Sequence, residues 1–264
     1  MKTYIIHKLN PKIIADWEVL WKNSPQANYS NSPYWFLSVI ESFDYKQYII
    51  IAIYNNDGLQ AIAWLIKERK LGFDYYSLCP SDYVYGSPFL IDYTNKALVT
   101  ELTDNLLNIG NVIINNVPKD DTCYLTSCSQ KITAVPRAIN LQMVLKSDDL
   151  GKAVIPNRNK IIYRVKKIEN RFSLKSHNGY NPDALQTAFS IDKLSRKNER
   201  GYSAFSDNCI RRFYESLARH FAKHFSINIM YFDTIPIAYR IGFIINNVYY
   251  GSQIAYLSEY GQYT

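Results

Sequence analysis

Hydroxyl groups near the C-terminal end are the first side chains of this sequence whose spacing suggests chemistry. Tyr250 and Ser252 alternate along an apolar run, so both point to the same side of a strand. A hydroxyl in that position could donate a hydrogen bond to a developing oxyanion or relay a proton. The alternation does not say which side faces solvent, and many such tyrosines simply fill a core.

Two carboxylates bracket a loop in the first half of the chain. Asp82 and Asp92 flank a segment that contains Gly86 and Pro88, between an expected strand and an expected helix. A carboxylate there could orient an acceptor amine or hydroxyl. The structural alternative is that Asp92 caps a helix starting near Thr94, which aspartate does routinely. The two roles are compatible.

A basic cluster precedes the longest amphipathic segment. Arg200 follows Arg196 and Lys197, and Tyr202 comes two residues later. Arginine binds phosphate or carboxylate through two parallel hydrogen bonds, so an anionic acceptor is its natural partner. The alternative is a solvated loop. We expect Tyr202 to lie in the core or in a cleft wall.

The positive charge of the chain belongs to one segment. Residues 151–231 hold 16 basic and 6 acidic residues, a net charge of +10, whereas residues 1–150 carry a net charge of −2. This field favours an anionic partner such as a phosphate, nucleotide, nucleic acid or acidic glycan. A basic helix expected at 158–170 is mainly the wet side of an amphipathic helix, with phosphate or RNA contact as the alternative.

Other chemistries have little support in the sequence. His220 and His224 stand four apart but lack a third ligand nearby, so we expect no metal. The four cysteines show no CxxC spacing, and no apolar run reaches about 18 residues. We therefore expect a protein without a membrane span, located in the cytoplasm.

Two hairpins, a domain length apart, read almost alike. Residues 48–54 and 61–66 flank an Asn-Asp-Gly turn, and residues 227–232 and 237–243 flank a turn near Asp233. Ile62-Ala63-Trp64 and Ile237-Ala238-Tyr239 occupy matching places just after each turn. The echo suggests a duplicated unit with a site shared between two halves.

The remaining elements give a mixed α+β pattern. Helices are expected from Pro11, from Pro33, over 97–109, from Pro182 and from Ser206-Asp207. Further strands are expected at 73–78, 112–117, 123–126, 141–145 and 172–176. A polar stretch at 146–157 is the best linker, which gives an N-terminal lobe over 1–150 and a C-terminal lobe over 151–264.

Several stretches together resemble the FemAB-like branch of the GNAT acyltransferase superfamily, which includes CelD-like acetyltransferases. They are residues 82–92 (DYVYGSPFLID), 157–167 (NRNKIIYRVKK), 197–202 (KNERGY), Ile237-Ala238 and 249–252 (YYGS). The resemblance covers about 30–264 and implies two tandem GNAT-like lobes, in agreement with the repeated hairpin.

The resemblance implies transfer of an acyl group from acyl-CoA to an amine or hydroxyl of an anionic envelope or polysaccharide precursor. Asp92 and Arg200 would hold the acceptor, together with Asp82, Tyr83, Tyr85, Lys197 and Tyr202, while Tyr250 and Ser252 line the reacting centre. Three alternatives stay open: an aminoacyltransferase that uses aminoacyl-tRNA, a non-catalytic binding module for an anionic glycan or sugar nucleotide, and a basic RNA-binding protein.

One departure from the family concerns the donor. GNAT folds hold the acyl-CoA pyrophosphate on backbone N–H groups at the start of a helix that follows the central strand. Here that strand is expected to end near Leu257, and no such turn or helix follows before Thr264. We expect the second lobe to be incomplete at its C-terminus.

Overall fold

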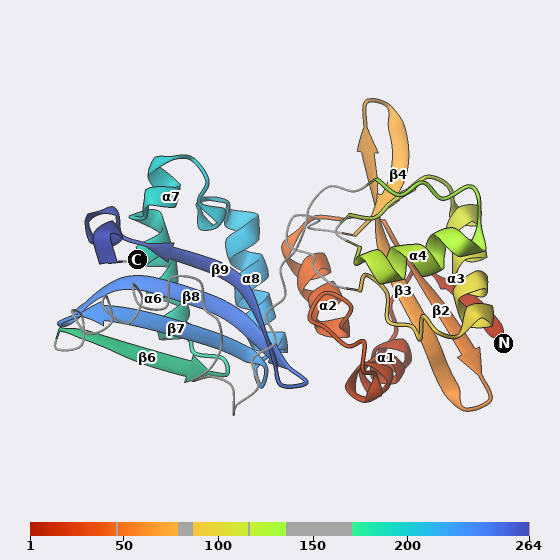
Figure 1. Cartoon of the computed structure of the whole chain (residues 1–264), viewed down its shortest axis with the longest axis horizontal. Coiled ribbons are helices and arrows are strands. Elements are labelled where there is room, and N and C mark those ends of the chain that lie inside the picture. The colour runs from red at the N-terminus through yellow and green to blue at the C-terminus, as the bar shows by residue number, and fades with distance from the viewer. Residues whose placement is uncertain (46, 79–86, 116, 136–170, 264) are drawn as a thin grey trace.

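The computed structural model describes residues 1–45, 47–78, 87–115, 117–135 and 171–263. They form two α+β lobes that lie side by side (Figure 1). The expected strand at 141–145, the linker at 146–157, the boundary between 150 and 151 and the basic helix at 158–170 lie outside the described residues. Within the described part, no helix is long and apolar enough to cross a bilayer.

The first lobe is built on a sheet of order β1-β2-β3-β4-β5, in which only the β4–β5 pair is parallel. Helix α1 packs on β3, and α3 packs on both β2 and β3. The strands are β1 (Lys2–Ile6), β2 (Tyr48–Asn55), β3 (Gly58–Lys70), β4 (Phe73–Ser77) and β5 (Val112–Ile113). The helices are α1 (Pro11–Asn23), α2 (Pro33–Ser42), α3 (Lys96–Ile109) and α4 (Lys119–Cys128).

The second lobe carries an antiparallel sheet of order β6-β7-β8-β9. Its strands are β6 (Phe172–Asn178), β7 (Phe225–Phe232), β8 (Ile235–Ile245) and β9 (Val248–Tyr256). Its helices are α6 (Pro182–Lys193), α7 (Arg196–Glu199), η3 (Ala204–Ser206), α8 (Asn208–His220) and η4 (Ser258–Tyr263). Whether this lobe is incomplete stays a prediction.

The two lobes repeat one order of elements, namely a strand, two long helices and then three antiparallel strands, and in the second lobe the short α7 and η3 lie between the two long helices. Both predicted hairpins are confirmed, and each has a register shift close to its turn, at Ile53/Tyr54 and at Met230/Tyr231. The predicted helix starts are also confirmed, because Asn10, Ser32 and Asn181 all cap their helices ahead of a proline. The expectation of tandem lobes in an α+β fold is correct.

Two predicted strands differ from the structure. Residues 123–126 belong to helix α4, not to a strand, because Asp120 and Asp121 follow Pro118 and stabilise the positive end of a helix dipole. The strand expected at 112–117 is only the two-residue β5. Both errors came from reading short apolar runs without weighing the acidic residues that open a helix.

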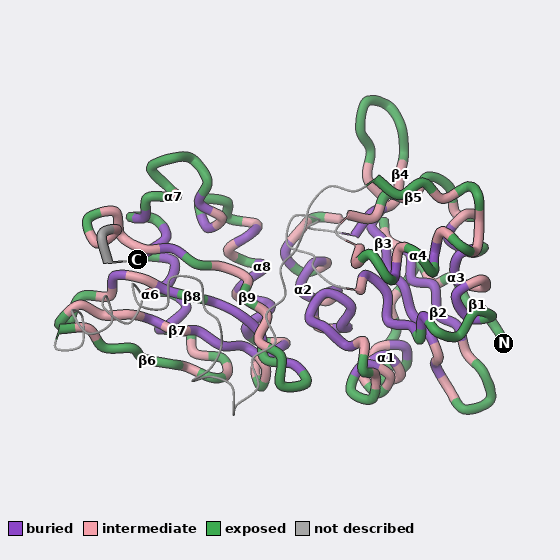
Figure 2. Tube along the Cα trace, in the orientation of Figure 1, coloured by how far each residue is buried: buried purple, intermediate pink, exposed green. Residues whose placement is uncertain are grey.

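Aromatic side chains join the lobes into one core. Trp35 of α2 meets Phe213 of α8 edge to face with ring centres 4.8 Å apart, and both are fully buried. Tyr29 stacks on Phe243 of β8 at 5.0 Å. In Figure 2 the buried colour runs through α2 at this contact. The seam between the lobes is therefore a packed interior, which fixes their relative placement.

Candidate active site

The two candidate hydroxyls of β9 face inward. Tyr250 lies opposite Phe243 in the sheet and contacts the ring of Tyr29 from the first lobe, with centres 5.5 Å apart. Ser252 Oγ lies 2.5 Å from the hydroxyl of Tyr214, a fully buried residue of α8. The structure thus brings Tyr250 and Ser252 together on the helix side of the second sheet, with Tyr250 at the seam.

Burial raises the pKa of the Tyr250 hydroxyl. A tyrosine hydroxyl is protonated at neutral pH already, and the raised pKa keeps it so, which leaves the group able to donate a hydrogen bond. Its neighbour Tyr249 points to the opposite face, where its ring occupies the space that a Cβ on Gly242 would need. Arg240 lies over that ring, 4.6 Å from its centre. The two adjacent tyrosines thus have clearly different surroundings.

A buried polar loop between α1 and α2 carries Tyr29 to the seam. Asn28 Oδ1 accepts hydrogen bonds from the backbone N–H groups of Ser30 (2.9 Å) and Asn31 (3.2 Å). The amide groups of Asn28 and Asn31 both donate to the carbonyl of Ser87, at 3.0 and 3.3 Å. Sequence reasoning missed this loop, since its polar composition is typical of an exposed connection.

The loop that contains the first-half candidates is anchored at its C-terminal end. Ser87 Oγ donates a 2.6 Å hydrogen bond to the carboxylate of Asp121 on α4, and burial raises the pKa of that carboxyl. Asp82, Tyr83 and Tyr85 lie outside the described residues. Their proposed contact with an acceptor stays a prediction.

Asp92 lies in an exposed turn before α3. Its carboxylate accepts hydrogen bonds from the backbone N–H of Thr94 (2.9 Å) and from the Thr94 hydroxyl (2.6 Å). Asn95 is the residue that caps α3 itself, through Leu98 N. The alternative in which Asp92 caps the helix is therefore present in a modified form. Asp92 stabilises the turn that precedes the helix, and Asn95 is the cap.

The basic cluster lies on the surface of the second lobe. Arg200 caps the C-terminal end of α7 and is exposed, as is Tyr202 at 77%. The expectation that Tyr202 lies in the core or in a cleft wall is wrong, because the chain turns outward at Gly201, whose φ is +74°. Lys197 is half-buried on α7.

A buried carboxylate holds the segment that presents this cluster. Asp192 is fully buried and accepts hydrogen bonds from Tyr239 Oη (2.7 Å), from Ser203 Oγ and from the backbone N–H of Phe205 (3.3 Å). On the other side of the segment, Ser195 pairs with Leu257, just past β9. The segment is thus fixed at both ends.

Among the candidates that the structure describes, Arg200 lies apart from Tyr250, Ser252 and Asp92. Leu257, which anchors the segment before α7, lies seven residues beyond Tyr250, or about 23 Å along an extended strand. Asp92 precedes α3 in the other lobe, on the opposite side of the molecule from α7 (Figure 1). A single small acceptor cannot contact both Asp92 and Arg200 in this arrangement.

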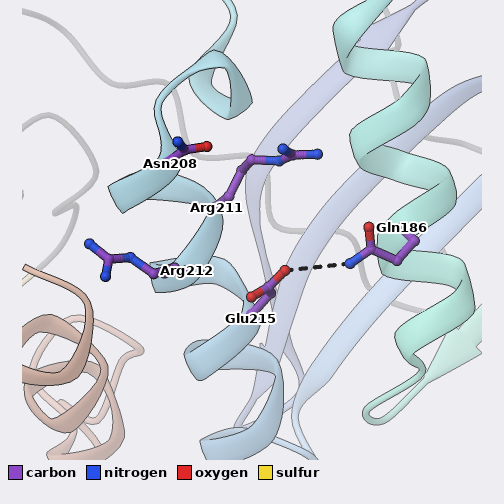
Figure 3. A pocket seen from close by; sticks show the side chains of 5 residues that line it. All are labelled: Gln186, Asn208, Arg211, Arg212 and Glu215. Carbon is purple, nitrogen blue, oxygen red and sulfur yellow. Dashed lines mark hydrogen bonds between the residues drawn. The ribbon is translucent and has the colours of Figure 1, made fainter.

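A depression that sequence reasoning did not predict opens between α6 and α8 (Figure 3). It has a volume of about 540 Å³ and is lined by Gln186, Asn208, Arg211, Arg212 and Glu215. Gln186 donates to Glu215 at 3.4 Å, and the Arg211 guanidinium lies 5.2 Å from the ring centre of Phe189. The adjacent arginines at the start of α8 were the available signal, and they place two positive charges beside the depression.

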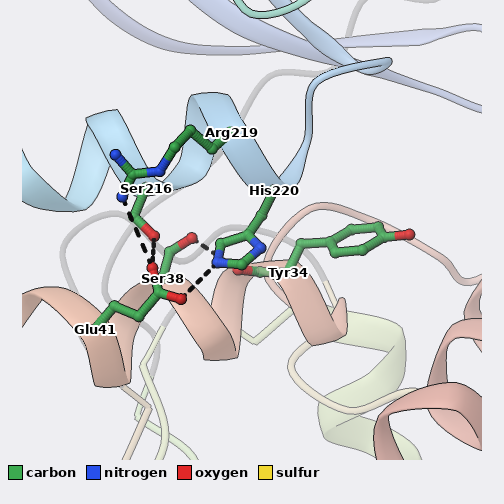
Figure 4. A network of polar contacts seen from close by, with 6 residues as sticks. All are labelled: Tyr34, Ser38, Glu41, Ser216, Arg219 and His220. Atoms are coloured by element: carbon green, nitrogen blue, oxygen red, sulfur yellow. Dashed lines mark hydrogen bonds and ion pairs between the residues drawn. The ribbon is translucent and has the colours of Figure 1, made fainter. Parts of the chain in front are cut away.

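The histidines near the end of α8 have separate partners. His220 Nε2 lies 2.8 Å from Glu41 Oε1 across the seam (Figure 4), whereas His224 Nδ1 lies 2.9 Å from the carbonyl oxygen of Ile244. In the described part of the chain, no group of three His, Cys, Asp or Glu residues could hold a metal ion. The two histidines thus serve structural contacts.

Comparison with known proteins defines the class. Residues 157–264 match the family model of the acetyltransferase (GNAT) domain. The second half of the chain is thus similar to a GNAT domain, in agreement with the resemblance to the GNAT superfamily that the sequence predicts. No curated protein matches the chain.

Solved structures extend the likeness to both lobes. The crystal structure of FemX superposes with a TM-score of 0.56 at 15% identity, over 87% of this chain and 57% of the FemX chain. A conserved protein of unknown function from Bacteroides thetaiotaomicron VPI-5482 gives a TM-score of 0.60 at 16% identity, over 97% and 81% of the two chains. At these identities the likeness concerns the fold.

Proposed function

We propose that this chain is an acyltransferase that moves an acyl group from acyl-CoA to an amine or hydroxyl of an anionic acceptor, such as a sugar nucleotide or glycan precursor. The observation that carries the proposal is the position of Tyr250. Its hydroxyl, with a raised pKa, belongs to the inward face of β9 within the GNAT-like region and at the seam with the first lobe.

The proposed reaction forms no covalent intermediate on the protein. The acceptor nitrogen or oxygen attacks the thioester carbonyl, and negative charge develops on the carbonyl oxygen. The C–S bond then breaks to release the CoA thiolate, and the proton that the acceptor loses to solvent balances the proton that the thiolate takes up. The Tyr250 hydroxyl donates a hydrogen bond to the oxyanion or a proton to the departing sulfur. Ser252 has an indirect role through Tyr214, because the two hydroxyl oxygens lie 2.5 Å apart.

Anionic groups of the substrates have two candidate positions in the second lobe. Arg211 and Arg212 line the depression beside α6, and within the described residues neither forms an ion pair with a carboxylate. Arg200 and Lys197 present a second basic surface on α7. We propose acceptor binding for the α7 surface, with Lys197, Arg200 and Tyr202 as its contacts. Asp92 lies too far from this surface to contact the same small acceptor, and the roles of Asp82, Tyr83 and Tyr85 stay predictions. A cytoplasmic location also stays a prediction.

The test compares two adjacent tyrosines. With acetyl-CoA and a panel of UDP-sugars, release of the free CoA thiol measures turnover. Tyr250→Phe should lower kcat about 10- to 100-fold, because one donor to the transition state is lost. Tyr249→Phe, on the opposite face of the same strand, is the matched control and should retain full activity. Equal losses in both variants would contradict the assignment.

The alternative functions have distinct outcomes in the same experiments. The net charge of +10 over residues 151–231 favours, as a second candidate, an aminoacyl-tRNA donor. In that case acetyl-CoA gives no thiol release, and labelled aminoacyl-tRNA gives transfer. A binding module would show thermal stabilisation by UDP-sugars without turnover of either donor.

A further inference from the structure

The hairpin between β3 and β4 projects beyond the body of the first lobe, and its tip is exposed (Figures 1 and 2). Leu71 is 89% exposed and Phe73 is 73% exposed. Lys70 and Phe73 are the last paired residues, so Leu71 and Gly72 form a two-residue turn. Two large apolar side chains therefore lie in solvent where the hairpin ends.

The turn also holds leucine in an unfavourable backbone conformation. The φ angles of Leu71 and Gly72 are +51° and +85°, and positive φ at both central residues requires a type I′ turn. Glycine, asparagine and aspartate adopt such angles readily, whereas leucine does not. The β8–β9 turn has similar angles, +50° and +61°, and places Asn246 and Asn247 there.

Folding alone therefore does not account for Leu71. The residue contributes strain to the turn, and with 89% of it exposed it gains almost nothing from packing. An asparagine would suit both the conformation and the solvent. A leucine in this position is instead suited to contact with something outside the chain.

Basic residues surround the apolar tip. The end of β3 next to the turn carries Lys67, Arg69 and Lys70, and the Arg69 side chain is 74% exposed. Asp74 lies 2.9 Å from Lys67 and 3.8 Å from Arg69 and neutralises part of this charge. Glu68 lies between Lys67 and Arg69, accepts a hydrogen bond from Ser77 and adds a second negative charge, so three basic residues face two acidic ones. The tip keeps a positive excess, with Lys70 adjacent to Leu71.

We propose that this tip docks on an anionic lipid surface, with Leu71 and Phe73 inserted among the acyl chains and Lys70 and Arg69 at the headgroups. The surface of two apolar side chains at the end of a hairpin is far smaller than the roughly 800 Å² that each partner buries in a stable protein interface. A membrane needs no complementary shape, and weak apolar insertion combined with basic residues gives reversible attachment. The positive collar selects anionic over zwitterionic lipid.

The experiment measures sedimentation of the whole chain with vesicles. Binding should be clear with equal amounts of phosphatidylglycerol and phosphatidylcholine, weak with phosphatidylcholine alone, and reduced by added salt. Leu71→Asn should lower vesicle binding about tenfold, because the inserted apolar side chain is lost. The same substitution should leave the melting temperature unchanged or raise it, since asparagine suits the turn.

A control variant and two outcomes keep the proposal falsifiable. Leu194→Asn replaces another exposed leucine, 66% exposed in the second lobe, and should bind vesicles like the original chain. Equal binding by Leu71→Asn and the original chain would overturn the proposal, as would no binding to anionic vesicles at low salt. A dimer in solution that Leu71→Asn abolishes would overturn it in favour of a second copy of the chain.

Discussion

The two lobes connect their paired helices in opposite ways. In the first lobe, residues 24–32 between α1 and α2 turn inward, and every residue from 27 to 32 is buried. In the second lobe, residues 194–207 between α6 and α8 turn outward and expose Arg196, Arg200 and Tyr202. The same position in a repeated topology thus builds the seam in one lobe and leaves a basic surface accessible in the other.

The two sheets also differ in how far their strands are buried. Strand β2 is buried from Ile49 to Ile53 without alternation, in a sheet on which α3 packs over β2 and β3 and α1 packs over β3. Strand β8 instead places buried Ile237, Tyr239 and Ile241 between residues that are less buried. The first lobe is thus the more enclosed support, and the second lobe has a more accessible sheet.

The largest expected effect separates the two helix connections. Asn28→Ala should lower the free energy of unfolding by about 3 kcal/mol, because it leaves buried N–H groups and the Ser87 carbonyl without partners. Arg200→Ala should change that free energy by less than about 0.5 kcal/mol. Urea denaturation measures both, and equal losses would contradict the comparison.

Arg200→Ala should have a large effect on acceptor binding, in contrast to its small effect on stability. We expect the KM of the acceptor to rise about tenfold while the KM of the donor hardly changes, because a charge-assisted contact to an anion is lost. Steady-state kinetics with each substrate varied in turn tests this result. Equal changes in the two KM values would remove Arg200 from the acceptor site.

The sequence was most informative where local chemistry decides the structure. Asn-Asp-Gly and the Asn-Pro helix starts depend on backbone preferences of a few residues, and they predicted the hairpins and helices correctly. The inward turn of Asn28 and Asn31 depends on Ser87, 56 residues or more away. No local pattern indicates such a partner, so the sequence gives no sign that these polar residues are buried.

Equivalent positions after the two hairpin turns give a further prediction. Tyr239 Oη donates to the buried Asp192 carboxylate at 2.7 Å, whereas the buried indole N–H of Trp64 has no hydrogen-bond partner among the residues that the structure describes. Tyr239→Phe should therefore cost about 2 kcal/mol of unfolding free energy. Trp64→Phe should change it by no more than about 1 kcal/mol, because a small cavity offsets the removal of an unsatisfied donor.

Thermal and urea unfolding of the two variants decides whether the repeat is energetically symmetrical. The asymmetry predicted here also has a structural readout, since loss of the Tyr239 contact should loosen the segment from Ser195 to Ser203. Faster proteolysis of that segment in Tyr239→Phe is expected. Equal unfolding free energies for the two variants would show that the lobes use these positions alike.

The smallest expected effect lies at the seam itself. Burial opposes ionisation of Glu41, but hydrogen bonds from Ser216 (2.5 Å) and His220 (2.8 Å), with Arg219 at 3.9 Å, outweigh it and lower the pKa of its carboxyl. A carboxyl whose pKa is lower in the folded state adds stability above its unfolded value, and that contribution disappears as the pH falls through the folded value.

Glu41→Gln should therefore lower the unfolding free energy by less than about 1 kcal/mol at neutral pH, since the side chain is 44% exposed and solvent screens its charge. The difference from the original chain should vanish below the lowered pKa of Glu41. Asp16→Asn is the matched control, because Lys12 lowers the pKa of Asp16 within the first lobe alone. Urea denaturation tests whether Glu41 couples the lobes. If both variants lose the same stability but only Glu41→Gln unfolds in two separate transitions, the seam contact couples the two lobes. A single transition in Glu41→Gln would instead assign the coupling to the aromatic core around Trp35.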